Sequence, residues 1–245
     1  GGYGNCGGGD YYCSFVHSGE KVGQYASLAL DSADQPNIAY YDGTNGTLLF
    51  AVYNYTFDDW TIDQIRVGSA EHPAGQYASL AIDVNHGDMP HIAYLSDYDT
   101  LEYAYYVGHD GNCGLNGIMV YTWQCDEIDF MGSSTHPKGI SLALDEAGFP
   151  IIAYQFGDSI LKIARPVEAL DKLIGNCGPA TPNYTWQCDV ISIGFGIGQG
   201  DYMSLAINDS GLSTIAYFGT IDPSGGDLNI AYQQFQVFLP LTLNN

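Results

Sequence analysis

Positively charged side chains are scarce in this chain. Its 245 residues include 6 Lys and Arg against 28 Asp and Glu, so the formal net charge is −22. Proteins bind nucleic acid and anionic lipid through clustered Lys and Arg. Half of the basic residues here lie in one stretch, at Lys162, Arg165 and Lys172. We therefore expect no nucleic acid among the partners.

Long apolar runs are also missing. No stretch approaches the roughly 18 apolar residues that a membrane-spanning helix needs, so we expect no membrane span. The chain starts Gly1-Gly2-Tyr3 without an initiator Met, as a processed mature protein would. These features predict a secreted protein, located outside the cell or at its surface.

Motifs for catalysis are absent as well. The chain has no G-x-S-x-G sequence for a serine nucleophile and no H-E-x-x-H sequence for zinc. A glycosidase needs two carboxyl groups about 5–10 Å apart, but 28 acidic residues allow such a pair almost anywhere. The sequence predicts no catalytic residue and no required cofactor, so we expect that the chain is not an enzyme.

One strand pattern occurs four times. Each copy has Ser-Leu-Ala followed by Leu or Ile, then a turn, then Ile-Ala-Tyr, and the serines are 52, 62 and 63 residues apart. The copies run Ser27–Tyr40, Ser79–Tyr94, Ser141–Tyr154 and Ser204–Tyr217. A repeat of this length, made only of short strands, is typical of a β-propeller with one blade per repeat.

Alternation within the repeat predicts blades of four antiparallel strands. Leu28 and Leu30 share one face of their strand and Ser27 and Ala29 the other, so bulky and small faces of successive blades can pack together. We expect an all-β, four-bladed propeller over residues 1–233 as one domain, with repeats at about 24–68, 76–130, 138–194 and 201–233. The last repeat lacks its fourth strand, so residues 5–17 should complete it and close the ring with the N-terminal strand.

Six cysteines form three pairs of one layout, in which Asn-Cys-Gly precedes a second cysteine. The layout predicts three local disulfides: Cys6–Cys13, Cys113–Cys125 and Cys177–Cys188. The spacings lack a short C-x-x-C knuckle with nearby histidines, which argues against zinc. Disulfides agree with export to an oxidising compartment.

An apolar, strand-like tail, residues 234–245, follows the repeats. Its apolar side chains are Phe235, Val237, Phe238, Leu239, Leu241 and Leu243. A strand of this kind pairs readily with an open sheet edge. The tail therefore predicts an assembly site for copies of this chain, and packing on its own propeller is the alternative.

Acidic loops and tyrosines indicate two kinds of ligand. Asp42, Asp97 and Asp99 lie in loops rich in hard oxygen ligands, so calcium is a candidate ion, with solvated loops as the alternative. Tyrosine rings suit sugars. The tyrosines that we expect to be exposed are Tyr41, Tyr98, Tyr105 and Tyr106, whereas Tyr40, Tyr94, Tyr154 and Tyr217 should be core.

Four N-x-S/T sequons offer glycosylation sites in an exported protein. They begin at Asn45, Asn54, Asn183 and Asn208. Sequons also arise by chance in a chain this rich in Asn and Thr.

The repeat resembles those of secreted bacterial β-propeller proteins. The likeness rests on Ser-Leu-Ala-Leu-Asp followed by Ile-Ala-Tyr-Tyr-Asp and covers residues about 11–233. The ending Phe238–Leu243 is similar to tails on exported proteins of Chloroflexota-type bacteria. The resemblance implies a fold and not an activity. Sialidase-type propellers fit poorly, because they use three arginines for a carboxylate and this chain has only Arg66 and Arg165.

These features together lead to an expected function. We expect a non-enzymatic extracellular structural protein that self-associates at the cell surface as a filament subunit joined through its terminal strands. The alternative is a carbohydrate-binding, lectin-like propeller whose partners are cell-surface glycans. A glycoside-active enzyme ranks third.

Overall fold

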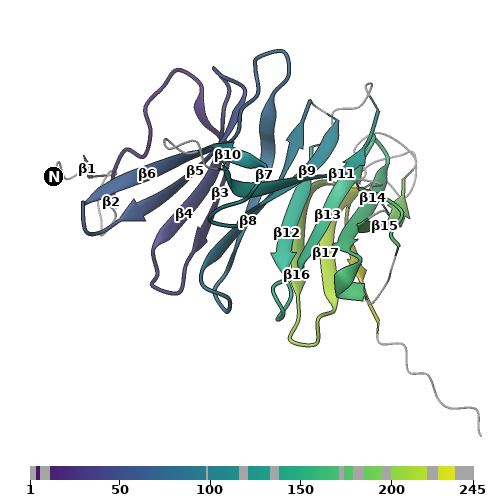
Figure 1. Ribbon diagram of the computed structural model, residues 1–245. Coiled ribbons are helices and arrows are strands. Elements are labelled where there is room, and N and C mark those ends of the chain that lie inside the picture. The colour runs from purple at the N-terminus through teal and green to yellow at the C-terminus, as the bar shows by residue number, and fades with distance from the viewer. Residues whose placement is uncertain are drawn as a thin grey trace, which may run out of the picture.

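Four antiparallel sheets stand side by side in a four-bladed propeller arrangement (Figure 1). The structure is a computed structural model, and it describes residues 4–5, 12–97, 99–115, 121–132, 138–170, 174–178, 185–194, 200–219 and 226–234. Within these ranges the only helix is the 3-10 turn η1 (Glu168–Leu170). The predicted all-β class is confirmed. None of the helical structure in these ranges is long and apolar enough to cross a membrane.

Each blade is one sequence repeat. Blade 1 consists of β3 (Val22–Leu30), β4 (Pro36–Asp42), β5 (Thr47–Asn54) and β6 (Asp59–Arg66). Blade 2 consists of β7 (Ala74–Asp83), β8 (Met89–Ser96), β9 (Thr100–Tyr106), β11 (Tyr121–Phe130) and, outermost, β10 (Cys113–Leu115). Blade 3 consists of β12 (Ile140–Leu144), β13 (Pro150–Phe156), β14 (Ile160–Pro166) and β15 (Trp186–Ile193). Blade 4 consists of β16 (Asp201–Ile207), β17 (Ser213–Gly219) and β18 (Asp227–Tyr232).

Polar side chains hold the turn that follows each inner strand. The Asp31 carboxylate accepts hydrogen bonds from Ala33 N and Gln35 N at 2.9 and 2.8 Å. Asp145 and Asn208 accept the equivalent pair of bonds in blades 3 and 4. These are Asx turns, in which a short side chain replaces a backbone acceptor. The acids at these positions therefore serve the fold.

A repeated hydrogen bond joins blade 1 to blade 2, blade 2 to blade 3 and blade 3 to blade 4. The bonds run from Leu80 N to Ser27 Oγ at 3.0 Å, from Leu142 N to Ser79 Oγ at 3.0 Å and from Leu205 N to Ser141 Oγ at 2.9 Å. Each bond satisfies a leucine amide on the inner strand of the next blade. Without it, a buried amide would stay unpaired at a cost of about 1–3 kcal/mol. This explains why serine recurs in an otherwise apolar strand.

Apolar clusters between the blades form the core. The cluster between blades 1 and 2 contains the fully buried Trp123, and the cluster between blades 2 and 3 contains Trp186. The cluster between blades 3 and 4 contains no tryptophan among the described residues. The tyrosines of Ile-Ala-Tyr are buried as predicted: Tyr40, Tyr94, Tyr154 and Tyr217.

Two of the predicted disulfides, Cys113–Cys125 and Cys177–Cys188, are confirmed. Cys13 is also disulfide-bonded, and Cys6 lies outside the described residues. An asparagine clamps each described hairpin. Asn112 donates to Cys125 O at 2.9 Å and accepts from Cys125 N at 2.7 Å. Asn176 does the same with Cys188.

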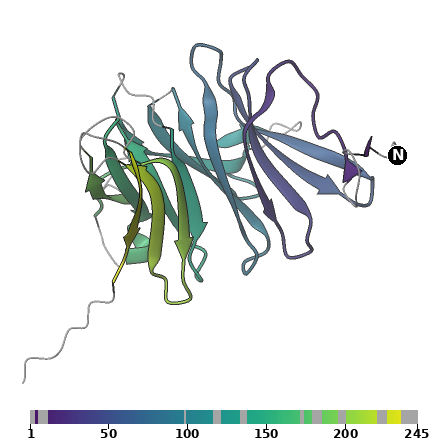
Figure 2. The same ribbon diagram turned by 180° about the vertical axis from the view of Figure 1, so that it is seen from behind.

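The structure does not place the N-terminal strand on the last blade. β2 (Tyr12–Cys13) pairs with β1 (Gly4–Asn5), and β18 is the outer edge of blade 4 among the described residues. Blades 1 and 4 lie at opposite ends of the row of sheets (Figure 2). The predicted closure of the ring is therefore not confirmed. The tail positions Phe235, Val237, Phe238, Leu239, Leu241 and Leu243 lie outside the described residues.

Candidate functional site

The starts of the four inner strands meet around one cavity at a pole of the propeller. This axial pocket has a volume of ≈200 Å³. Tyr25 of β3, Tyr77 of β7 and Tyr202 of β16 line it, together with Lys138 and Gly139 directly before β12. Tyr25, Tyr77, Gly139 and Tyr202 all lie two residues before the shared serine of their repeats. The pocket is therefore built from equivalent positions of all four repeats.

Each of the three tyrosines has a left-handed backbone. The φ angle is 52° at Tyr25, 53° at Tyr77 and 51° at Tyr202. All three lie where the register of the inner strand shifts against its neighbour, as in a β-bulge. A bulky residue held at positive φ costs about 1–3 kcal/mol, and such strain concentrates at ligand sites. Bulges also redirect side chains next to such sites, so the strained tyrosines point to binding.

The third repeat has Gly139 at the tyrosine position, and close packing explains the difference. A Cβ atom at residue 139 would lie 2.3 Å from Gly200 O, so the approach of blades 3 and 4 leaves no room for a side chain. Lys138 lines the pocket from the preceding position, and its amide donates to Gln155 Oε1 at 2.7 Å. The polar side chains that line the pocket are therefore three tyrosines and one lysine.

The tyrosines offer both ring faces and hydroxyl groups. The ring centroids of Tyr25 and Tyr77 lie 4.4 Å apart, and the rings are tilted by 37°. Burial, a hydrogen bond with Tyr25 and the charge of Asp201 raise the pKa of Tyr77 to about 12. The Tyr77 hydroxyl therefore keeps its proton at neutral pH. Tyr202 is 82% exposed, so its ring is open to a ligand that arrives from solvent.

Asp201 adds a buried acceptor next to the axial pocket. It directly precedes Tyr202, and its charge reaches Tyr77. Asp201 is buried, and its Oδ1 atom accepts no hydrogen bond from any described residue. A buried carboxylate oxygen without a donor is costly.

A larger cavity of ≈400 Å³ lies between blades 2 and 3, beside the turn that follows β12. Asp126 and Glu168 line this interblade cavity, together with Tyr105, Trp186 and His91. Burial raises the pKa of Tyr105, and the charges of Asp126 and Glu168 raise it further. Burial also lowers the pKa of His91 to about 4, so this imidazole is neutral at pH 7. Two carboxyl groups therefore share one aromatic-lined cavity.

The sequence did not single out the axial tyrosines. Of the tyrosines expected to be exposed, Tyr41 is buried, Tyr98 lies outside the described residues, and Tyr105 and Tyr106 are half-buried. The expectation for Tyr41 is wrong because β4 lies inside its blade, between β3 and β5. A signal for the axial site was present, since tyrosine stands two residues before the serine in three of four repeats. Regular strand alternation hides it, because only a bulge turns these side chains toward the axis.

The predicted calcium ligands do not gather at one point. Asp42 accepts hydrogen bonds from Thr44 N and from Asn45 within its own turn. Asp97 lies 3.0 Å from the His72 ring in blade 2, and Asp99 is buried in the same turn as Asp97. In the part of the chain that the structure describes, no three His, Cys, Asp or Glu side chains group as a metal site would need. Calcium stays a prediction.

The sequons lie in turns where they are described. Asn45 and Asn208 are exposed and Asn54 is half-buried. Asn45 Nδ2 donates to Asp42 Oδ2 at 2.7 Å, so a glycan there would break this bond. Asn183 lies outside the described residues. Glycosylation stays a prediction at all four positions.

Comparison with known proteins gives likeness of fold only. No protein-family model matches the chain, and no curated protein matches it. An engineered GH43 glycoside hydrolase with endo-xylanase and exo-arabinofuranosidase activity is 13% identical, with a TM-score of 0.45 over 86% of this chain and 38% of that chain. A bifunctional GH43-CE protein of Bacteroides eggerthii is 11% identical, with a TM-score of 0.46 over 84% of this chain and 28% of that chain. An intramolecular trans-sialidase of Ruminococcus gnavus is 13% identical, with a TM-score of 0.44 over 88% of this chain and 43% of that chain.

This comparison corrects two predictions. The structures that resemble the chain are two GH43 proteins, one a glycoside hydrolase, and a trans-sialidase. Two predictions are therefore wrong. One is that the chain is a non-enzymatic, self-associating structural protein, and the other is that it is not an enzyme. The first rested on the disulfides, the apolar tail and the missing catalytic motifs, and the second on the missing motifs. Carboxyl groups that separate blades bring together leave no motif in a sequence. The chain spans less than half of each matched structure, and at 11–13% identity no substrate or catalytic residue carries over.

Proposed function

We propose that this chain recognises carbohydrate and that one sugar unit binds in the axial pocket between Tyr25, Tyr77 and Tyr202. The observation that carries the proposal is the left-handed backbone of three equivalent tyrosines around one cavity. Glycine would fit this conformation without strain, yet tyrosine stands at all three left-handed positions. Backbone strain that persists at three equivalent positions around one cavity is expected of a binding site.

The chemistry of the axial pocket suits a sugar. Pyranose rings carry apolar C–H faces and hydroxyl edges, which match tyrosine rings and their hydroxyl groups. Lys138 supplies a charged donor beside them. The volume of ≈200 Å³ is below the roughly 300 Å³ at which ligand pockets usually begin. The pocket therefore fits one unit of a longer glycan.

The protein acts outside the cell in this proposal. Disulfides persist in oxidising compartments such as the periplasm and the extracellular space, and two are present in the described residues. Glycans of a cell surface or of a surrounding matrix are then within reach.

A glycan array with the labelled protein, followed by calorimetry on the best ligand, tests the proposal. Tyr25→Ala, Tyr77→Ala and Tyr202→Ala should each weaken binding at least tenfold, which is about 1.4 kcal/mol. Tyr55→Ala is the matched control, because Tyr55 is an exposed tyrosine outside the pocket. Absence of binding on the array, or equal loss in the Tyr55 variant, would contradict the proposal.

A second candidate function is cleavage of a glycosidic bond in the interblade cavity. The observation that favours it is the presence of Asp126 and Glu168 in one cavity with Tyr105 and Trp186. Glycosidases use two carboxyl groups about 5–10 Å apart, one as the acid and one as the base or nucleophile. Asp126 lies in β11 of blade 2 and Glu168 in η1 of blade 3, so only the fold unites them.

Chromogenic glycosides test this second candidate. Asp126→Asn and Glu168→Gln should each lower turnover by at least about 100-fold, whereas Asp110→Asn, an exposed carboxylate of blade 2, should leave it unchanged. No hydrolysis by the unaltered protein, or unchanged hydrolysis in both cavity variants, would exclude the cavity as a catalytic site. The axial pocket can then still bind sugar, so the two candidates fail separately.

A further inference from the structure

The outer face of blade 4 is exposed where the same face of the other blades is buried. The register puts Leu48, Leu101, Leu161 and Leu228 at equivalent positions of the third strands. The first three are 0% exposed and Leu228 is 86% exposed. Two residues further along the same face of these strands, Phe50, Tyr103 and Ile163 are buried and Ile230 is exposed. Blade 4 therefore carries a face made for a following blade.

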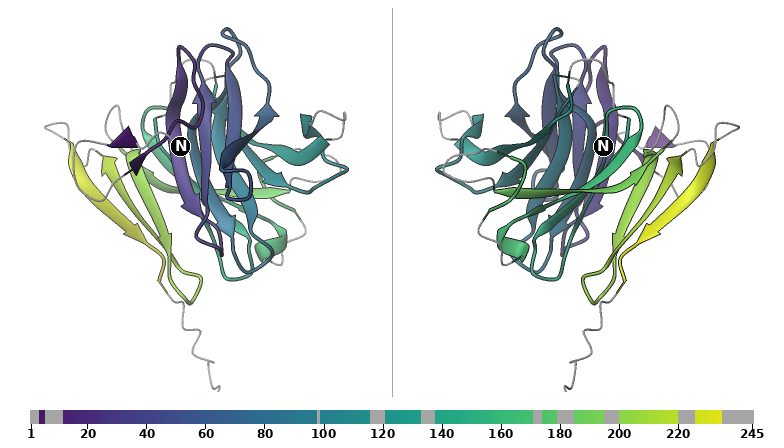
Figure 3. Two further views of the ribbon diagram at one scale, coloured as in Figure 1. Left: turned by 90° about the vertical axis from the view of Figure 1, so that its left-hand side faces the viewer. Right: turned by 90° about the vertical axis from the view of Figure 1, so that its right-hand side faces the viewer.

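Blade 1 carries the opposite half of the same interface. Leu80, Leu142 and Leu205 are buried against the preceding blade, whereas the equivalent Leu28 is 63% exposed. Ser204 Oγ and Leu28 N are the two halves of the blade-to-blade hydrogen bond, and no bond joins them in the described residues. Figure 3 shows blade 4, yellow-green, splayed away from the purple blade 1.

The N-terminal hairpin has the form of a missing outer hairpin. In blade 2, Cys113 pairs with Trp123, so Asn112 stands opposite Gln124, one residue before Cys125. In β1 and β2, Asn5 pairs with Tyr12, one residue before Cys13. The two hairpins therefore have the same register relative to their cysteines. Blade 2 has such a hairpin at its edge, and blade 4 ends at β18.

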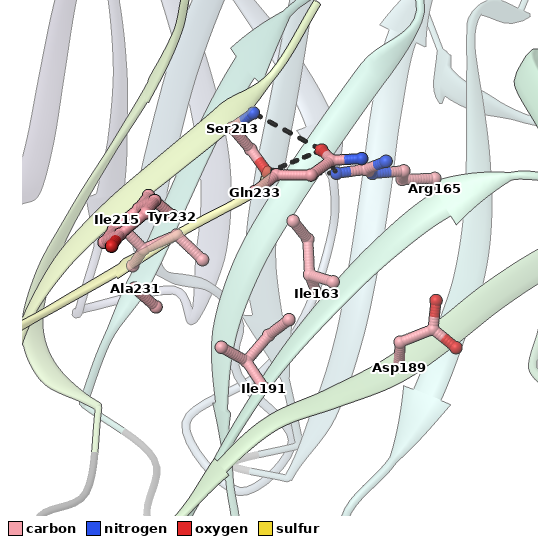
Figure 4. A pocket seen from close by; sticks show the side chains of 9 residues that line it. All are labelled: Ile163, Arg165, Asp189, Ile191, Ser213, Ile215, Ala231, Tyr232 and Gln233. Carbon is pink, nitrogen blue, oxygen red and sulfur yellow. Dashed lines mark hydrogen bonds between the residues drawn. The ribbon is translucent and has the colours of Figure 1, made fainter. Parts of the chain in front are cut away.

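A cavity marks the place for this hairpin. Trp123 packs on Phe50, and Trp186 packs on Tyr103, each with ring centroids 5.3 Å apart. In blade 3, Ile163 takes the position of Phe50 and Tyr103. It lines an open cavity of ≈250 Å³ (Figure 4). The other walls of this cavity include Arg165 and Asp189 of blade 3 and Ala231 and Gln233 of blade 4. Each tryptophan precedes the second cysteine of its hairpin by two residues, and Tyr11 precedes Cys13 by two.

Val16 already lies where an outer strand of a preceding blade would put it. Ile62 and Cys125 are equivalent residues of the outer strands of blades 1 and 2. The residue three positions after Ile62 is Ile65, which shares an apolar cluster with Tyr94 of blade 2. The residue three positions after Cys125 is Ile128, which shares a cluster with Tyr154 of blade 3. Val16, three residues after Cys13, packs in the cluster of Tyr40 in blade 1.

We propose that the ring closes within one chain, with residues 12–15 added as the fourth strand of blade 4 and blade 4 packed against blade 1. In the register of the other blades, Cys125 and Cys188 stand opposite Ala104 and Ala164. Cys13 then stands opposite Ala231 and Ser14 opposite Ile230. Ser204 Oγ then accepts the hydrogen bond of Leu28 N.

An engineered disulfide tests the register. Residues directly opposite in antiparallel strands are close enough for a disulfide, so Ser14→Cys with Ile230→Cys should cross-link within a monomer, as read by peptide mapping and by mass in solution. Ser14→Cys with Leu228→Cys is the matched control, two residues out of register, and should not cross-link. No cross-link, equal cross-linking in the control, or a cross-link between two chains would overturn the proposal.

A serine series tests the contact between blades 4 and 1 without new cysteines. Ser141→Ala leaves the Leu205 amide unpaired and should lower Tm. Ser204→Ala should lower Tm by the same amount if Leu28 N donates to it in the closed ring. An unchanged Tm for Ser204→Ala would overturn the closure.

Discussion

The strain at Tyr202 predicts a substitution that stabilises the fold while it removes the proposed function. Tyr202 has φ 51° and is 82% exposed, so its side chain contributes little packing. The left-handed conformation costs an L-residue about 1–2 kcal/mol. Glycine removes this cost and loses about 0.5–1 kcal/mol of backbone entropy. Tyr202→Gly should therefore be more stable than Tyr202→Ala by about 0.5–1 kcal/mol, which raises Tm by about 1–4 °C.

The sign of this difference is the test. Tyr121 is an exposed tyrosine of β11 whose φ is not positive, so Tyr121→Gly should be less stable than Tyr121→Ala by about 0.5–1 kcal/mol. Thermal and denaturant unfolding of the four variants gives both differences. If glycine is worse than alanine at residue 202 as well, Tyr202 is not strained, and the main argument for the axial pocket is refuted. Both Tyr202 variants should lose sugar binding.

Three further predictions concern stability. The pKa of His91 lies at about 4 when folded, below its ordinary 6.5, so the free energy of unfolding should fall as pH drops from 6.5 toward 4. His91→Asn should flatten this dependence. If denaturant unfolding gives the variant the same slope of stability against pH as the unaltered protein, the prediction is contradicted. Replacing Cys113 and Cys125 by Ala should cost about 2–3 kcal/mol, measured by urea unfolding, and a smaller loss would show that the Asn clamp suffices. Lys162 Nζ and Asp129 Oδ2 lie 2.8 Å apart and nearly buried, so Lys162→Met should cost about 3 kcal/mol; a neutral effect in calorimetry would show that Asp129 needs no cation.

The fold could be predicted from the sequence because packing repeats. Serine at residues 27, 79 and 141 recurs for a hydrogen bond to the next blade, and the acids that follow the inner strands recur for Asx turns. The cysteine layout predicted the two described disulfides for the same reason. Local, repeated interactions leave a repeated pattern in the sequence.

The candidate sites could not be predicted in the same way. The axial pocket depends on bulges that turn Tyr25, Tyr77 and Tyr202 toward one cavity, and strand alternation does not show a bulge. The interblade cavity unites Asp126 and Glu168 across two blades. Among 28 acidic residues, only three-dimensional packing selects these two.

Calorimetric titration of the best glycan ligand into the unaltered protein and into a triple variant, Tyr25→Ala with Tyr77→Ala and Tyr202→Ala, tests the central claim most directly. We expect saturable binding of about one sugar site per chain in the first and no measurable heat in the second, with circular dichroism and Tm showing that the triple variant is folded. Equal affinity in both proteins would contradict the account, because the sugar would then bind somewhere other than the axial pocket.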